Sequence, residues 1–364
     1  MTNREEELLE LIRENPAISQ NELAAALDIT RSSVAVHISN LTKKGYILGK
    51  GYILREEDYI CVLGGTNMDL IGRPEKTLIL GDSNPGQVKM AMGGVGRNIA
   101  ENLVHLGVPV KLISAVGDDL YGKRVLEHAS KIGLDMRHTL VLNHKPTSTY
   151  LAILDEQGDM KAAIAQMEIL EELNIAFLQS KRQVIENARI CIIDTNTPID
   201  VIHYVLDNFK STKFYLDTVS STKALKVKDK IGAFHTIKPN KIEAELLSGR
   251  KIESLQDMKA ASTYFLNQGV QRVFISLGAE GVFYDDGTVD QLIPNPKVEV
   301  VNATGAGDAF LAALAFSEFH QYDIDKSARF AMAAAILALS YEETINPNMS
   351  QETVEKKMKE IGLC

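Results

Sequence analysis

The sequence predicts two units: a small helical unit at the N-terminus, then an α/β unit with a doubly wound, mostly parallel sheet and a small β lid. Three observations support this prediction. The 364 residues are enough for two domains. An acidic cluster at residues 56–58 marks a boundary, so we expect domains at 1–57 and 58–364. Beyond it, short β-rich runs alternate with helical stretches, which is typical of a parallel sheet covered on both faces.

The composition is that of an ordinary globular protein, with 45% hydrophobic and 24% charged residues. It excludes wholesale disorder and a fibrous repeat. The longest apolar run, residues 330–339, is about half the length of a membrane-spanning helix, so we expect no membrane partner. Three scattered cysteines, Cys61, Cys191 and Cys364, favour neither a disulfide framework nor a zinc cluster. We therefore expect a reducing, cytoplasmic location.

Charge is distributed unevenly within the small N-terminal unit. The net charge of the chain is −9, which argues against general nucleic-acid binding. Residues 1–28 carry seven acidic side chains against Arg4 and Arg13, whereas residues 29–55 carry five basic side chains and no acidic one. The second half of this unit is thus the part suited to a polyanion.

Three helices are expected in this unit. Apolar residues repeat on one face across residues 4–14. Ser19 and Glu22 form an S-x-x-E capping box that begins a second helix. Thr30 can cap a third helix, whose inward positions fall at residues 34, 38 and 41.

The segment 46–54 is nearly symmetric about Gly-Lys-Gly and predicts a β-hairpin. Three helices followed by a hairpin resemble a winged helix-turn-helix domain, with the third helix as the DNA reader. The residues expected to contact DNA are Arg31, Ser32, Ser39, Asn40, Lys43 and, on the wing, Lys50. A small dimerisation or docking module would have the same pattern. Because winged helices often act on paired half-sites, we also expect a homodimer.

The large unit is expected to alternate strands and helices. The predicted strands are 59–63, 110–115, 190–194, 213–216, 235–238 and 272–277. The predicted helices are 95–106, 122–131, 200–208, 241–247 and 258–268. Two segments interrupt the alternation, at 77–92 and 147–160, and we expect them to form the antiparallel lid.

The strongest chemical signal is Thr304-Gly-Ala-Gly-Asp-Ala-Phe310, between a predicted strand at 298–301 and a helix at 309–316. Glycines at a strand-to-helix turn let backbone N–H groups converge on an anion, and the helix dipole adds positive potential. Asp308 at the same corner can accept a proton from an attacking hydroxyl. Together they indicate phosphoryl transfer. The alternative is a packing turn in which Asp308 is only an N-cap.

Other motifs follow predicted strands, where α/β proteins bind ligands. Asn67 and Asp69 come after the first strand, and Gly94 and Asn98 lie where a helix begins; such residues suit the hydroxyls of a polyol. Asn240 and Glu243 lie one helical turn apart and suit Mg²⁺ held through water, or simply a solvated helix start. The turn from Ser276 to Gly281 could border a nucleotide.

In this order, these residues resemble the ribokinase-like sugar and nucleoside kinases, the PfkB family, over roughly residues 59–350. The resemblance implies a ribokinase-like fold with ATP as donor and Mg²⁺ as cofactor. It implies Asp308 as the base and Gly305, Ala306 and Gly307 as the anion hole. It implies sugar binding by Asn67, Asp69, Gly94 and Asn98. It also implies cofactor binding by Asn240, Glu243, Ser276, Gly278, Gly281 and Thr304. Many members carry Asp where this chain has Asn302. An amide oxygen could still bind K⁺, but the resemblance does not imply activation by K⁺ here.

Within the family, the strings around Asp82–Gly86, Gly93–Ala100 and Ser114–Asp119 are most similar to bacterial pseudouridine kinases. This resemblance implies phosphorylation of the pseudouridine 5′-hydroxyl. Arg97 stands where plain sugar kinases usually have a small residue and is assigned to the substrate site. Ser83, Asn84 and Thr149 could offer hydrogen bonds to a uracil edge, or could only form turns. The alternatives are a ribokinase, fructokinase or other nucleoside kinase, and a transcription regulator whose kinase-like domain senses a ligand.

Overall fold

The computed structural model describes residues 2–16, 18–49, 58–298 and 300–363. The chain divides into two compact units, Met1–Asp58 and Tyr59–Cys364. This division falls after residue 58, one residue beyond the boundary expected after residue 57. Among the described residues, no helix combines the length and the apolar character needed to cross a bilayer.

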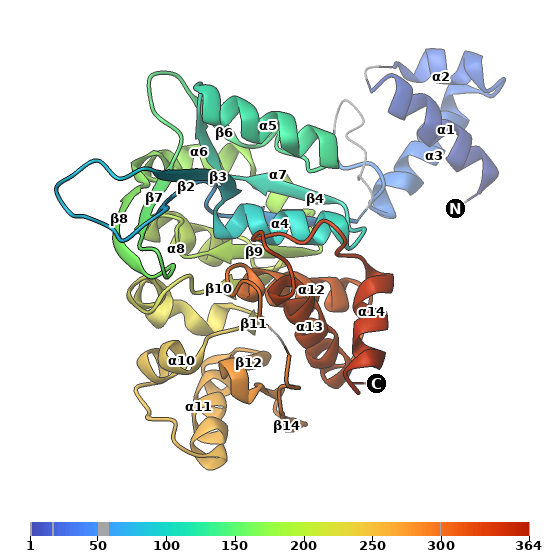
Figure 1. The fold of residues 1–364 in the computed structure, drawn as a ribbon. Helices are drawn as coiled ribbons and strands as arrows, with labels where there is room; N and C mark the ends of the chain where they lie inside the picture. Colours follow the sequence, from blue (N-terminus) through green and yellow to red (C-terminus); the bar gives the residue numbers. More distant parts are fainter. Residues whose placement is uncertain (1, 17, 50–57, 299, 364) are drawn as a thin grey trace. The chain divides into compact units, whose positions relative to one another are not determined.

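The described part of the N-terminal unit contains three helices: α1 (Asn3–Glu14), α2 (Gln20–Ala26) and α3 (Arg31–Lys43) (Figure 1). Each begins at a hydroxyl cap, and Ser19 forms the predicted capping box with Glu22. The helices enclose a small core of aliphatic side chains: Leu8, Leu9, Ile12, Leu23, Leu27, Val34, Leu41 and Ile47. Most of the predicted hairpin, with Lys50, lies outside the described residues.

The large unit is built on an eight-stranded sheet in the order β14-β13-β12-β11-β10-β9-β1-β4. Its strands are β1 (Ile60–Leu63), β4 (Val110–Ile113), β9 (Ile190–Asp194), β10 (Lys213–Asp217), β11 (Thr236–Ile237), β12 (Arg272–Ser276), β13 (Val282–Asp285) and β14 (Asp290–Ile293). The pairings from β4 to β12 are parallel, and β13 and β14 add an antiparallel edge.

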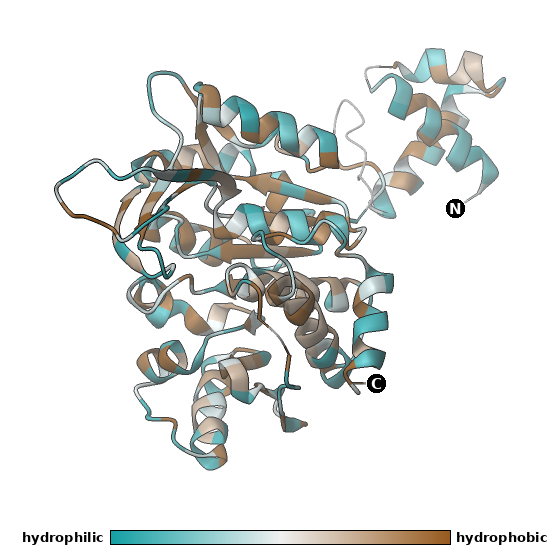
Figure 2. Ribbon diagram, in the orientation of Figure 1, coloured by the Kyte–Doolittle hydropathy of each residue, from teal (hydrophilic) through white to brown (hydrophobic). Residues whose placement is uncertain are grey.

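Both faces of this sheet are buried. Alternate residues of β1 point to opposite sides: Ile60 and Val62 belong to one core, and Cys61 and Leu63 to the other. Five helices cover the first face: α4 (Val95–His105), α5 (Leu120–Ile132), α12 (Ala306–Phe319), α13 (Ile324–Leu339) and α14 (Gln351–Glu360). Figure 2 shows hydrophobic residues along the central strands and along α12 and α13. The doubly wound class is thereby confirmed.

The second face is covered by shorter elements. Its helices are α6 (Ile175–Ser180), α7 (Arg182–Glu186), α8 (Ile199–Asn208), α9 (Ser221–Ala224), α10 (Lys241–Ser248) and α11 (Leu255–Gln268). Short 3₁₀ segments lie at Glu168–Glu172, Leu225–Ala233 and Gly278–Glu280. Two short parallel strands, β5 (Ala115–Gly117) and β6 (Leu140–Leu142), form a separate sheet.

The lid is a four-stranded sheet in the order β3-β2-β7-β8. Its strands are β2 (Asn67–Pro74), β3 (Gly86–Gly93), β7 (Thr149–Leu154) and β8 (Met160–Gln166). The bounds expected for the lid, 77–92 and 147–160, were too narrow, because they omit β2 and almost all of β8. Every residue of β8 is exposed, so its sequence lacks the polar–apolar alternation that marks a half-buried strand.

The strand expected at 298–301 is wrong for the residues described there. Val298, Val300 and Val301 are not in a strand, and the last two are 55% and 54% exposed. The Val301 N–H donates instead to the carbonyl of Leu339, at the end of α13. The valines indicated a strand, but tertiary contacts hold this segment against a helix end.

Candidate active site

The candidate site lies where the parallel strands end. Asp194 and Asp217 are the last residues of β9 and β10 and are paired across those neighbouring strands. Lys238 follows β11, and the glycines at 64 and 65 follow β1. The carboxyl ends of parallel strands form the usual ligand crevice of an α/β fold.

Asp308 is in the first turn of α12 and is only 9% exposed. The Asn98 side chain, from α4, donates its Nδ2 hydrogen to Asp308 Oδ2 at 2.9 Å. Burial raises the pKa of Asp308 to about 8, and the nearby Asp217 carboxylate adds to this rise, while the Asn98 hydrogen bond and the Lys238 charge oppose it. A buried carboxyl with such a pKa can take up and release a proton near neutral pH.

The turn before Asp308 can form an anion site. Gly305 caps α12 with a left-handed φ of 82°, and the first N–H groups of a helix have no partner within it. A Cβ at Gly307 would lie 3.3 Å from Lys238 Nζ, so the ammonium group is next to this turn. Lys238 itself is buried and lies 3.6 Å from Asp217. Helix dipole, N–H groups and a lysine therefore concentrate positive potential beside Asp308.

A cavity of about 590 Å³ opens next to this turn. The predicted nucleotide residues Ser276, Gly278 and Gly281 line it, together with Gly307 and Lys238. Its apolar wall is formed by side chains of α12 and α13: Phe310, Met332, Ala335, Ile336 and Leu339. An apolar slot that ends at an anion site suits a nucleotide, with the base in the slot and the phosphates at the turn.

The predicted polyol residues lie where β2 meets the start of α4, the helix that carries Asn98: Gly93 pairs with Asn67, and a Cβ at Gly93 would collide with the Asp69 carboxylate. Asn67 donates to Asp69 at 2.5 Å, and both belong to β2 of the lid. Burial raises the pKa of Asp69, although the Asn67 hydrogen bond and the Arg97 charge lower it. Gly94 has a φ of 98°, and a Cβ there would lie 2.6 Å from the backbone of Thr66, so only glycine fits.

Several residues assigned to the substrate are placed differently. Arg97 is buried, and its guanidinium group is engaged within the chain by the Met92 carbonyl and Asn98 Oδ1. The Asn84 amide is used within its own turn, with bonds to the backbone of Ile79 and Asp82. Ser83 is exposed in the same loop, between β2 and β3. Thr149 begins β7 beside Met68, so it is the one of these that borders the Asn67–Asp69 pair.

Asn240 and Glu243 form a capping box at the start of α10. Asn240 Oδ1 accepts from the Glu243 N–H, while Glu243 Oε2 accepts from the Asn240 N–H and the Thr218 hydroxyl. The structure gives this pair a role at the helix start. The oxygen atoms of the pair, one from an amide and the others from a carboxylate, would also suit Mg²⁺ held through water. No cluster of three or more acidic, histidine or cysteine side chains suited to a metal occurs among the described residues.

Thr304 and Asn302 stabilise the turn that leads into α12. The Thr304 N–H donates to Asn302 Oδ1 at 2.9 Å, and Asn302 Nδ2 donates to the carbonyl of Glu342 at 3.0 Å. Both atoms of the amide are therefore engaged within the chain.

Sequence reasoning missed Asp194, Asn196, Asp217, Lys223 and Lys238. Asp194 accepts hydrogen bonds from the backbone of Gly65 and Asn196, both at 2.8 Å, and Lys223 donates to Asn196 Oδ1 at 2.5 Å. Burial raises the pKa of Asp194 and lowers that of Lys223. A signal was present, because both apolar strands, ICIID and KFYLD, end on an aspartate at the sheet edge where ligands bind.

Comparison with known proteins matches the pfkB family of carbohydrate kinases to residues 57–351 and a winged helix-turn-helix DNA-binding family to residues 1–47. The chain is 38% identical to an uncharacterized sugar kinase of Escherichia coli, YeiI, over 97% of this chain and 98% of that protein. It is 37% identical to the pseudouridine kinase of E. coli, over 82% of this chain and 95% of that protein. The crystal structure of a proposed sugar kinase from Clostridium perfringens matches with a TM-score of 0.78 and 43% identity, covering 84% and 97%.

The chain therefore belongs to the pfkB family of carbohydrate kinases. It is an ATP-dependent kinase that acts on a carbohydrate or nucleoside, and a winged helix-turn-helix domain precedes the kinase domain.

Proposed function

We propose that this kinase transfers the γ-phosphoryl group of ATP to the 5′-hydroxyl of pseudouridine. The observation that carries the proposal is the position of Asp308. It follows Ala306 and Gly307, which line the cavity, and its carboxyl group is hydrogen-bonded to Asn98 of α4, whose start adjoins the Asn67–Asp69 pair. The choice of nucleoside is supported by the 37% identity to the pseudouridine kinase of E. coli.

In this proposal Asp308 accepts the proton of the attacking hydroxyl as the new P–O bond forms. Asn67, Asp69 and Asn98 hold the ribose hydroxyls so that the reacting oxygen faces the γ-phosphorus. The N–H groups of the Gly305–Gly307 turn, with Lys238, stabilise the negative charge that develops on the transferred group.

Asn240 and Glu243 would hold Mg²⁺ through its waters, and the ion would neutralise charge on the phosphates. Closure of the four-stranded lid over the nucleoside would exclude water, which would otherwise compete with the hydroxyl for the phosphoryl group.

The substrate is tested with one ATP-coupled assay on purified protein, in which pseudouridine, uridine, ribose and fructose are compared by kcat/KM. We expect turnover of pseudouridine well above that of the other three. Turnover confined to ribose or fructose would show a sugar kinase instead. A preference for uridine would show that the lid does not read the carbon-linked base.

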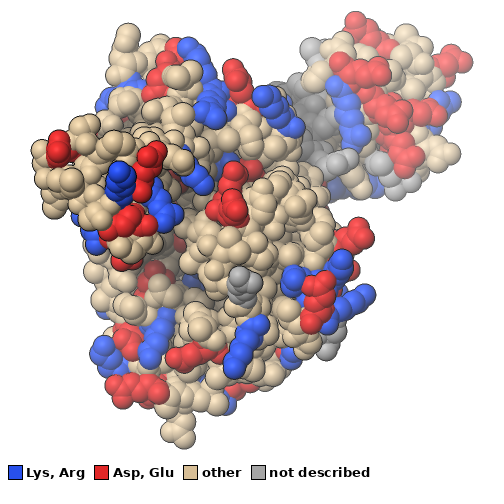
Figure 3. Space-filling model, viewed as in Figure 1, with Lys and Arg blue, Asp and Glu red and all other residues tan. Residues whose placement is uncertain are grey.

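We further propose that the N-terminal domain binds duplex DNA through α3. The exposed face of this helix carries Arg31, Ser32, Ser39 and Lys43, and Asn40 is half-exposed. Most acidic residues of this domain lie in α1 and α2, and Figure 3 shows acidic side chains gathered on one of its faces. Hydroxyl and amide groups suit base edges, and flanking basic groups suit phosphates.

The test is a salt titration of duplex DNA binding with full-length protein. Lys43→Ala should weaken binding across sequences and reduce the slope of log K against log salt by about one, as expected for one lost phosphate contact. The matched control is Arg13→Ala, which removes another exposed basic group, this one from α1. Equal losses in the two variants would mean that charge alone, and not α3, drives the binding.

A further inference from the structure

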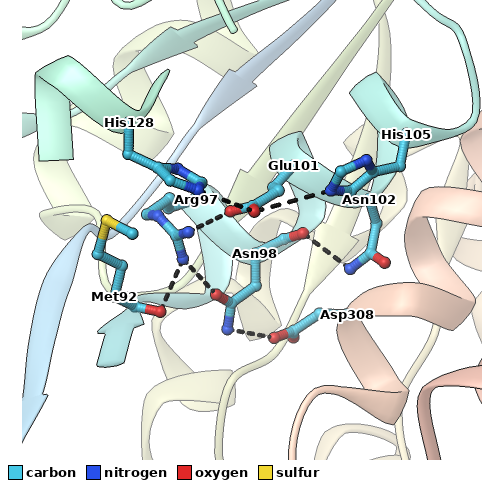
Figure 4. A network of polar contacts seen from close by, with 8 residues as sticks. All are labelled: Met92, Arg97, Asn98, Glu101, Asn102, His105, His128 and Asp308. Atoms are coloured by element: carbon cyan, nitrogen blue, oxygen red, sulfur yellow. Dashed lines mark hydrogen bonds and ion pairs between the residues drawn. The ribbon is translucent and has the colours of Figure 1, made fainter. Parts of the chain in front are cut away.

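A network of polar side chains extends from Asp308 through Asn98 into α4 (Figure 4). Its central member is Arg97 of α4. The guanidinium group donates to Asn98 Oδ1 at 3.1 Å and to the carbonyl of Met92 at 2.8 Å, and it is paired with Glu101. Asn98 in turn donates to Asp308.

Two features hold Arg97 in this place. Glu101 is buried, and the ring nitrogens of His105 and His128 each lie 3.8 Å from its other carboxylate oxygen. Burial raises the pKa of Glu101, but the nearby His105 ring and the Arg97 charge outweigh it and bring the pKa below its usual value. The ionised Glu101 thus anchors the guanidinium group, and Met92 joins it to the last residues of the lid strand β3.

We propose that Arg97 is a positioning residue that fixes the orientation of the Asn98 amide against Asp308. A guanidinium group has only donors, so the amide must turn its oxygen toward Arg97. The NH₂ group of Asn98 then faces Asp308, where it can only donate. The inference rests on the proposed role of Asp308 as the base.

Loss of Arg97 would remove this constraint. The Asn98 amide could then rotate by half a turn and present its oxygen to Asp308. An oxygen can accept a hydrogen bond only from a protonated carboxyl, so the proton would remain on Asp308 to higher pH. This substitution leaves unchanged the other charged groups that face Asp308. They are Asp217 of β10, Asp194 of β9 and Lys238 after β11.

The direct test is a carboxyl-carbon NMR titration of protein labelled at aspartate, with the Asp308 signal assigned from its absence in Asp308→Asn. In Arg97→Met we expect the Asp308 titration to move to higher pH. Arg97→Lys should restore it toward wild type, because an ammonium group also has only donors. The control is Arg182→Met, which removes an exposed arginine paired with Glu186 in α7.

Kinetics give a second readout. One lost orienting hydrogen bond of about 1.4 kcal/mol should lower kcat near neutral pH about tenfold, with recovery as the pH rises and little change in KM for the nucleoside. A structural role would instead lower kcat equally at all pH values. If Arg97→Met does not fold, Arg97→Leu serves, since its side chain likewise has no donor.

An Asp308 titration that is unchanged in a folded Arg97→Met or Arg97→Leu protein would overturn the inference. The inference would also be overturned if the Asp308 titration moved as far in Arg97→Lys as in Arg97→Met. The NMR titration needs no turnover. If the wild-type protein phosphorylates none of the tested substrates, the proposed function is overturned. The NMR titration would still decide whether Arg97 orients Asn98.

Discussion

At Asp308, the burial that brings the carboxyl next to the anion site also sets the pH range in which it can act as a base. Its pKa is raised to about 8, and a base must be ionised to accept a proton. We therefore expect kcat/KM for the nucleoside to rise with pH until about 8 and then level off. A profile measured across this range at saturating ATP checks this, and a rate that is flat through neutral pH would contradict it.

Asp308→Asn should lower kcat by about 10²–10⁴-fold, the usual contribution of a general base, with nucleoside affinity largely retained.

The substitution should also change the pH dependence of stability. Between its ordinary value of 3.8 and about 8, the folded protein holds a proton on Asp308 that the unfolded chain has lost. The stability that Asp308 contributes is therefore complete below the ordinary pKa and is lost as pH rises through 8.

This second effect is measured by chemical unfolding of both proteins at several pH values. The difference in unfolding free energy should move in favour of Asp308→Asn as the pH rises. A difference independent of pH would show that the carboxyl is ionised throughout, and wild-type turnover in the variant would remove Asp308 from the role of base.

Asn302 predicts how the enzyme responds to monovalent cations. Its NH₂ group donates to the Glu342 carbonyl, and its oxygen accepts from the Thr304 N–H. The Asn302 NH₂ group thus bonds directly to the Glu342 carbonyl. A carboxylate at position 302 has no such donor and would need a cation to bridge it to that carbonyl. We expect turnover to be equal in Na⁺ and K⁺ buffers, and Asn302→Asp to gain a dependence on K⁺. Strong K⁺ activation of the wild type would contradict this.

At the scale of elements, the sequence was most informative where local chemistry decides the structure. Ser19 and Glu22 predicted the start of α2, and the Gly-rich turn predicted the start of α12, because caps and glycine turns act within a few residues. Strand partners were harder to predict. The lid strand β8 is exposed along its length, and the valines near residue 300 are held by α13, so neither follows from periodicity.

The site shows the same division. Asp308, Asn98 and the Asn67–Asp69 pair were predicted as site residues because each lies in a recognisable local motif. Asp194 and Asp217 were missed because each looks like an ordinary residue after a buried strand, and only the pairing of β9 with β10 brings them together. The Arg97–Glu101 ion pair was not predicted, although the two residues are one helical turn apart on α4.

The first turn of α12 gives a prediction at this scale. Gly305 has a left-handed φ, and a Cβ there would collide with the backbone of Thr344. Gly107 has a similar φ of 88°, but a Cβ there would meet nothing within 4 Å. Gly305→Ala and Gly107→Ala should each lose roughly 1–2 kcal/mol of stability from the strained φ. Only Gly305→Ala should also lose turnover, because it displaces the anion site.

Thermal unfolding and kcat/KM, measured side by side for the two glycine variants, separate strain from displacement. Equal activities in both variants would mean that the turn is not part of the phosphate site.

At the scale of the whole molecule, each unit encloses its own core. The aliphatic core of residues 8–47 is separate from the two cores on the faces of the large sheet. All residues placed in the candidate active site belong to the second unit, Tyr59–Cys364. The kinase domain should therefore fold and act without the first unit, whereas any DNA binding should depend on the first unit.

We expect protein lacking residues 1–57 to keep kcat/KM for the nucleoside within about twofold of the full chain, since no residue of the site is removed, and to lose retention on duplex DNA. A cooperative thermal transition in the shortened protein, at a temperature close to one seen in the full chain, would show that the large core is independent. If the shortened protein aggregates or loses its transition, the small unit contributes to the kinase fold and the division into two independent domains is wrong. If it folds but loses turnover, the winged helix acts on the kinase site, and the two activities are coupled.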